Sequence, residues 1–115
     1  MNSVNLIGNL ATDVELREVG PEKKVASFLL AVDRASKDGG ADFVRITAWD
    51  RQAELSAEYL TKGRRVGIEG RLRSSSWEDE GKRRTSIEVV AHHVQFLGGP
   101  RNEEVTPFEP AVATT

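Results

Sequence analysis

The chain has 115 residues, a formal net charge of −2 and no cysteine. This length suits one domain with its own hydrophobic core, and the lack of cysteine excludes disulfides, thiolate metal sites and a cysteine nucleophile. Residues 1–99 carry 15 basic and 15 acidic side chains, so the net negative charge comes from residues 100–115.

Five segments rich in β-branched residues predict strands, because glycine-containing turn signals separate most of them. The segments cover residues 3–10, 24–32, 42–49, 64–77 and 84–97. The turn signals lie at residues 19–23, 36–42 and 78–82. The pattern indicates a mostly β protein built from hairpins.

Residues 51–62, between the third and fourth strands, break the alternation and predict one helix. The apolar residues that would share one face of this helix are Ala53, Ala57 and Leu60. We expect Asp50 to cap its amino end, with Lys62 and then Gly63 at its carboxyl end, where a cation and a left-handed glycine are favourable.

This order of elements predicts an all-β fold of the OB type, a five-stranded Greek-key barrel with one short helix between strands 3 and 4. Other small β barrels fit the same order. The domain would comprise residues 1–99. Residues 100–115 hold three of the four prolines and little that could pack, and they predict a short, disordered acidic tail.

The third strand, FVRITAW at residues 43–49, poses the main question about function. Alternation predicts that Val44, Ile46 and Ala48 point inward. The side chains expected to point outward are Phe43, Arg45, Thr47 and Trp49. Two exposed aromatic rings beside an arginine need an explanation other than the core.

The fourth strand repeats this pattern. Its inward set would be Val66, Ile68, Gly70 and Leu72, and its outward set Arg65, Glu69, Arg71, Arg73, Ser75 and Trp77. Aromatic rings beside arginines suit unpaired nucleic acid, because bases stack on the rings while arginines neutralise phosphates. The alternative for any one residue is structural, with Trp49 in the core and the arginines as solvated surface.

Other candidate residues favour structural roles. Phe28 has apolar neighbours and is expected in the core. His92 and His93 are adjacent in sequence, without metal-ligand spacing. No nucleophile has a nearby base, so we predict no catalytic residues, no metal and no cofactor.

Four stretches resemble the bacterial single-stranded DNA-binding protein family: NLIGNL, FVRITAW followed by AELSAEYLTKG, VGIEGRLRSSSW, and EVVAHHVQFLGG. They occur in the order typical of that family and cover about residues 2–99. The resemblance implies an OB fold, no catalysis, wrapping of single-stranded DNA and a homotetramer.

By position, Phe43, Trp49 and Trp77 match family aromatics that stack on bases, and Arg45, Arg71 and Arg73 match surface positions beside them. The remaining basic candidates for DNA binding are Arg34, Lys37, Arg65, Lys82, Arg83 and Arg84. Family members commonly end in an acidic Pro-Phe tip that recruits replication and repair enzymes. Here Pro107-Phe108 is followed by seven further residues, so we do not expect that recruitment.

The sequence therefore predicts a protein that binds and protects single-stranded DNA without strong sequence preference, in replication, recombination or repair. The alternative is an OB-fold subunit for protein interaction or RNA binding. The N-terminus does not resemble a signal peptide, and no apolar run is long enough to span a membrane. We expect a cytoplasmic, nucleoid-associated protein with no membrane partner.

Overall fold

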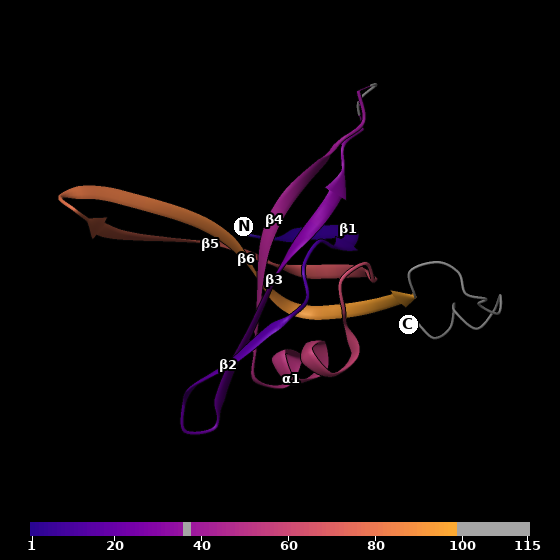
Figure 1. The fold of residues 1–115 in the computed structure, drawn as a ribbon, viewed down its shortest axis with the longest axis horizontal. Helices are drawn as coiled ribbons and strands as arrows, with labels where there is room; N and C mark the ends of the chain where they lie inside the picture. The colour runs from indigo at the N-terminus through magenta and orange to yellow at the C-terminus, as the bar shows by residue number, and fades with distance from the viewer. Residues whose placement is uncertain (36–37, 99–115) are drawn as a thin grey trace.

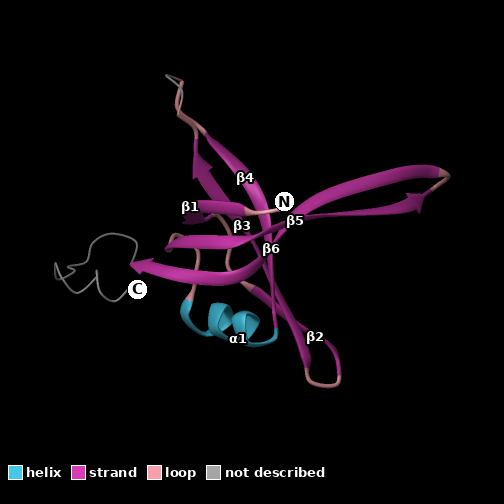
Figure 2. Ribbon diagram, turned by 180° about the vertical axis from the view of Figure 1, so that it is seen from behind, coloured by secondary structure: helices cyan, strands magenta, loops and turns pink. Residues whose placement is uncertain are grey.

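The computed structural model describes residues 1–35 and 38–98. Within these ranges the chain forms six strands and one helix, and the β2–β3, β3–β4 and β5–β6 hairpins extend from the centre in different directions (Figures 1 and 2). The elements are β1 (Val4–Leu10), β2 (Glu15–Gly20), β3 (Lys23–Asp33), β4 (Ala41–Trp49), α1 (Asp50–Tyr59), β5 (Arg65–Asp79) and β6 (Lys82–Gly98).

Five of these strands pair in a closed ring. Hydrogen-bonded neighbours follow the order β1–β5–β6–β4–β3, and β1 also pairs with β3. The β4–β6 pair is parallel and the others are antiparallel. The ring strands are the five that the sequence predicts, and α1 stands between the third and fourth of them in chain order.

The sixth strand, β2, was not predicted. It pairs with β3 outside the ring and forms a hairpin with it. Every residue of β2 is exposed, so its sequence lacks the alternation of buried and exposed side chains that reveals a strand.

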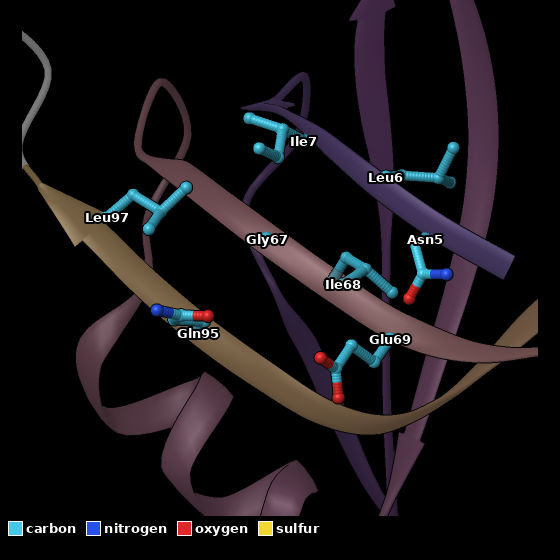
Figure 3. Close-up of a pocket in the computed structure, with 8 residues that line it drawn as sticks. All are labelled: Asn5, Leu6, Ile7, Gly67, Ile68, Glu69, Gln95 and Leu97. Atoms are coloured by element: carbon cyan, nitrogen blue, oxygen red, sulfur yellow. The ribbon is translucent and has the colours of Figure 1, made fainter. Parts of the chain in front are cut away.

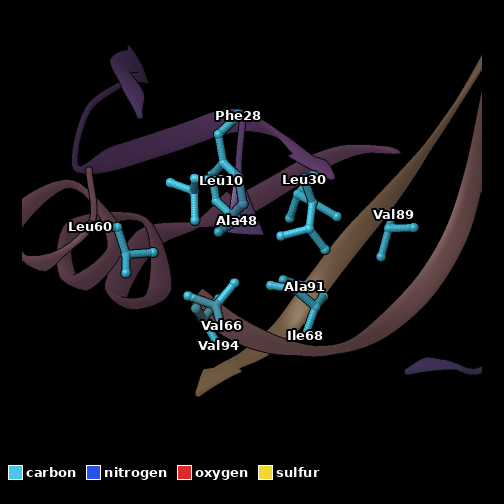
Figure 4. Close-up of a cluster of buried hydrophobic side chains, with 11 residues drawn as sticks. Leu10, Phe28, Leu30, Ala48, Leu60, Val66, Ile68, Val89, Ala91 and Val94 are labelled. Carbon is cyan, nitrogen blue, oxygen red and sulfur yellow. The ribbon is translucent and has the colours of Figure 1, made fainter. Parts of the chain in front are cut away.

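The hydrophobic core fills the ring (Figure 4). Its members are Leu10, Phe28, Leu30, Ile46, Ala48, Leu60, Val66, Ile68, Val89, Ala91 and Val94. Every ring strand contributes to this core, and Leu60 enters it directly after α1. The predicted core position of Phe28 and of the inward residues of β4 and early β5 is therefore confirmed. Each large side chain buried here contributes about 1.5–3 kcal/mol.

Two glycines allow the strands of the ring to approach closely. A Cβ atom at Gly8 would lie 2.3 Å from the carbonyl oxygen of Ala31, and one at Gly70 would lie 2.1 Å from that of Val90. Both distances are far inside van der Waals contact, so neither position accepts a side chain without backbone movement. Gly70, which belongs to the fourth predicted strand, is therefore required for the close approach of β5 to β6.

The helix is shorter than predicted and its ends differ. It covers Asp50–Tyr59 instead of 51–62, and the residue that precedes it, Trp49, makes no side-chain capping bond. Asp50 is therefore not the cap; its Oδ1 accepts a hydrogen bond from the Lys24 backbone N–H (3.3 Å). At the other end, Leu60 is already extended because the chain turns to insert its side chain into the core.

The residues expected to end the helix instead form the link to β5. Gly63 does adopt a left-handed conformation (φ 95°), but in a turn where the Arg64 N–H bonds to Thr61 O (3.1 Å). The Lys62 N–H donates to Asp13 Oδ1 (2.8 Å). The bond between Lys62 and Asp13 joins residues far apart in the chain and has no signal in the local sequence.

Side chains of α1 attach it to two strands. Gln52 Oε1 accepts a hydrogen bond from the Val94 N–H of β6 (3.1 Å), and Glu54 forms an ion pair with Lys24 of β3 (2.9 Å). The hydrogen bond and charge of Glu54 raise the pKa of the Lys24 ammonium above its usual value. The helix thus closes one end of the ring at a fixed position.

A β-bulge at His92 determines which side chains of β6 face inward. Glu69 pairs with His93 and Gly70 with Ala91, so β6 has one extra residue at this point. Even-numbered Val94 is buried on one side of the bulge, whereas odd-numbered Ala91 is buried on the other. Both histidines are exposed.

Candidate nucleic-acid interface

The strand register brings the outward side chains of β4, β6 and β5 onto one surface. Ile46 is paired with Val89, which puts Arg45 level with Glu88, and Glu88 is paired with Arg73. We call this surface the arginine face. Its members are Phe43, Arg45, Thr47 and Trp49 of β4, Arg71, Arg73, Ser75, Trp77 and Asp79 of β5, and Lys82, Arg84, Ser86, Glu88 and Val90 of β6.

The aromatic residues differ in their exposure. Phe43 is 63% exposed and Trp77 is 48% exposed, so both side chains are accessible to a stacked base. Trp49, where β4 runs into α1, is half-buried. Two of the three predicted stacking residues are therefore freely accessible, and the third offers only part of its ring.

Two residues do not have the exposure that simple alternation predicts. Thr47 belongs to the outward set but is only 6% exposed, because it lies mid-sheet between Ser27 of β3 and Val90 of β6. Its Oγ1 has no hydrogen-bond partner among the described residues. Leu72 belongs to the inward set but is 47% exposed, although its partner Val89 on β6 is buried in the core; the β5–β6 hairpin begins to leave the ring at this pair.

The basic cluster at the hairpin tip is divided between two faces. Arg84 lies opposite Trp77 and Lys82 opposite Asp79, both on the arginine face, whereas Arg83 lies opposite Glu78 on the other side. Arg84 also forms an ion pair with Asp79 (3.5 Å). The three residues therefore do not form one continuous clamp.

The remaining basic candidates lie away from this surface. Arg34 pairs with Asp42 (2.9 Å) at the β3–β4 hairpin, and Arg65 bonds to Asn9 of β1 (3.1 Å). Six residues of extended strand, or about 20 Å, separate Arg65 from Arg71. Lys37 lies outside the described residues.

Glu88 is a member of the arginine face that the sequence reading missed. Arg73 donates two hydrogen bonds to Glu88 Oε2, one from Nε (2.9 Å) and one from Nη2. On the other side, Arg45 Nε lies 3.8 Å from Oε1. The sequence could have predicted this contact from the β5–β6 hairpin. Counting back from the turn along its two strands puts Glu88 opposite Arg73.

The hollows on the outer surface of the described residues include two that adjoin the ring strands. One, of about 270 Å³, adjoins Arg45 on the arginine face, between β3 and the segment that follows β1. The other, of about 540 Å³, lies on the outer face of β1, β5 and β6 (Figure 3). We call the latter the Ile7 face; its register pairs Ile7 with Gly67 and Gly67 with Gln95, and Leu97 lies at its edge.

The described residues contain no cluster of three or more His, Asp or Glu side chains that could hold a metal ion. Among the same residues, no helix has the length and apolar character needed to cross a membrane.

In a comparison with known proteins, the profile of the Single-strand binding protein family matches residues 1–97 of this chain. Single-stranded DNA-binding protein 3 of Clostridium acetobutylicum is 47% identical over 84% of this chain and 71% of its own length. The Single-stranded DNA-binding protein of Clostridium tetani is 48% identical, covering 84% and 70% of the two chains. Single-stranded DNA-binding protein 2 of Clostridium acetobutylicum is 39% identical over 95% of this chain and 96% of its own length.

Proposed function

This chain belongs to the single-strand binding protein family and binds single-stranded DNA, and we propose that the arginine face is the surface that holds the strand. Family membership identifies the five-stranded ring as an OB fold, a fold that binds oligonucleotides across its outer strands.

The observation that carries this proposal is the register itself. It puts Arg45, Arg71 and Arg73 on one surface together with the exposed rings of Phe43 and Trp77. Each stacked base contributes roughly 1–3 kcal/mol whatever its identity, and the arginines add a salt-dependent attraction for phosphate. This combination supports binding without strong sequence preference.

Replacing Trp77 by Ala tests the proposal. We expect affinity for an oligo-dT to fall roughly 5- to 150-fold, the equivalent of one lost stacking contact, in a titration followed by fluorescence anisotropy. Tyr59→Ala is the matched control, because Tyr59 is an equally exposed aromatic residue (51%) on α1, away from the arginine face. A Trp77 variant that binds as tightly as the wild type would refute this surface as the site.

The names of the relatives favour single-stranded DNA over the alternative of a protein-interaction or RNA-binding subunit. Competition between oligo-dT and oligo-U of equal length checks this directly, and we expect oligo-dT to be preferred. We further propose that the chain has no catalytic activity, because the relatives are DNA-binding proteins and no side chain of the arginine face is arranged as a nucleophile with its base.

We also propose that the protein assembles with copies of itself, as a homotetramer, through the Ile7 face. Ile7 is 55% exposed and Leu97 is 37% exposed beside a hollow floored by Gly67, which has no side chain. Exposed apolar side chains around a hollow are typical of a protein interface. The Ile7 face involves the outer sides of β1 and the early part of β5, so assembly there leaves the arginine face open.

The proposed domain is residues 1–99, with residues 100–115 as a tail. That tail lies outside the described residues, and its sequence continues past Pro107-Phe108. We propose that it does not recruit replication or repair enzymes and that the protein is nucleoid-associated through DNA binding alone. Capture of such enzymes from an extract by the full chain, but not by residues 1–99, would contradict the first point.

A further inference from the structure

Glu88 occupies an unusual place for an acidic residue. It lies on β6 between the two strands that carry Arg45 and Arg73, within a surface proposed to bind a polyanion. Its side chain is only 12% exposed. Enclosing a carboxylate to this degree is costly unless it is paired, and its negative charge opposes phosphate binding beside it, so its presence on this surface needs an explanation.

The contacts of Glu88 show what it does to the cations beside it. Arg73 uses Nε and Nη2 on the carboxylate, so about three of the five N–H groups of its guanidinium remain for a ligand. Arg45 lies within ion-pair distance on the opposite side. The row of three side chains therefore has a net charge of +1 although it contains two arginines.

From this geometry we propose that Glu88 is a built-in competitor for DNA phosphate that limits how many cations of the arginine face a bound strand can neutralise. The carboxylate and a phosphodiester bind a guanidinium through the same kind of charge-assisted bond. A strand that binds across β4, β6 and β5 must share Arg45 and Arg73 with Glu88. This inference rests on the proposed role of the arginine face.

The same contacts explain why the carboxylate is kept. The guanidinium groups of Arg45 and Arg73, on the two strands that flank β6, repel each other in the free protein, and the carboxylate of Glu88 between them relieves this repulsion. Glu88 thus stabilises the free protein while it weakens the complex. Replacing it should move stability and affinity in opposite directions, a combination that a merely structural residue does not produce.

The test is Glu88→Gln, which retains an oxygen that can accept from Arg73 and removes the charge. Binding of the full chain to oligo-dT is measured from about 50 to 200 mM NaCl. One additional neutralised phosphate steepens the slope of log affinity against log salt by about 0.7, so the loss of affinity across this range should grow by about 2.6-fold. At the lowest salt the variant should bind more tightly than the wild type, and its melting temperature should be lower.

Glu58→Gln is the matched control, since Glu58 is an exposed carboxylate on α1 and the variant has the same net charge. We expect its salt slope to match that of the wild type. An unchanged slope for Glu88→Gln, or an equal steepening in both variants, would overturn the inference while the wild type still binds DNA. Absence of oligo-dT binding by the wild type would instead remove the proposed function on which the inference rests.

Discussion

At Gly70, β5 passes so close to β6 that no side chain fits. A Cβ atom there would lie 2.1 Å from Val90 O, a carbonyl oxygen of the backbone that cannot rotate away. We predict that Gly70→Ala lowers the free energy of unfolding by about 1–3 kcal/mol, measured by urea denaturation. Gly20→Ala is the control, because a Cβ at Gly20 meets nothing within 4 Å. Equal stability of the two variants would contradict this account of ring closure.

Single residues were predictable from the sequence wherever strand alternation holds. Phe43, Arg45 and Trp77 point outward because each lies on a regular strand with alternate residues on opposite faces. His92 and Glu88 were not predictable in this way. The bulge at His92 shifts the parity of β6, and the role of Glu88 depends on neighbours that are close in space but distant in sequence.

The outer part of the β5–β6 hairpin is an element that contributes little to the core, since every residue from 74 to 87 is exposed. Ser75 and Ser86 are directly paired, so a two-residue Asn-Gly turn can replace residues 76–85. We predict nearly unchanged thermal stability and a fall in oligo-dT affinity of at least the roughly 5- to 150-fold expected for one stacked base. Affinity equal to that of the full hairpin would show that this element does not contact the strand.

Elements differed in how far their sequences revealed them. The five ring strands each have an inward apolar set, and all five were predicted. β2 was missed because all its residues are exposed. The helix was found from its periodicity, but its ends were wrong because Leu60 is drawn into the core and Asp50 bonds to the backbone of β3. Tertiary contacts decide those ends.

At the scale of the whole molecule, the two faces proposed for DNA and for assembly occupy different stretches of the outer surface of the ring, and they approach each other on β5, where Glu69 and Arg71 are two residues apart. We predict that Ile7→Glu lowers the molar mass measured by light scattering, because it puts a charge in the centre of the Ile7 face. Val19→Glu, at a comparably exposed apolar side chain of β2 (47%), should leave the mass unchanged. A native mass for the Ile7 variant would contradict assembly through this face.

The closure of the ring could not be derived from the sequence alone. It depends on the β1–β3 and β4–β6 pairings, which join residues far apart in the chain, such as Ile46 and Val89. The order of elements indicated an OB fold among other small β barrels, and the family match identifies it.

The most direct test of the central claim is to map where a bound strand contacts the protein. Photo-crosslinking of an oligo-dT carrying reactive thymine analogues, followed by mass spectrometry of the peptides, gives these contacts. Our account predicts crosslinks at Phe43 and Trp77, on the arginine face. Crosslinks concentrated at Ile7 and Leu97 instead, with the arginine face unmodified, would contradict it.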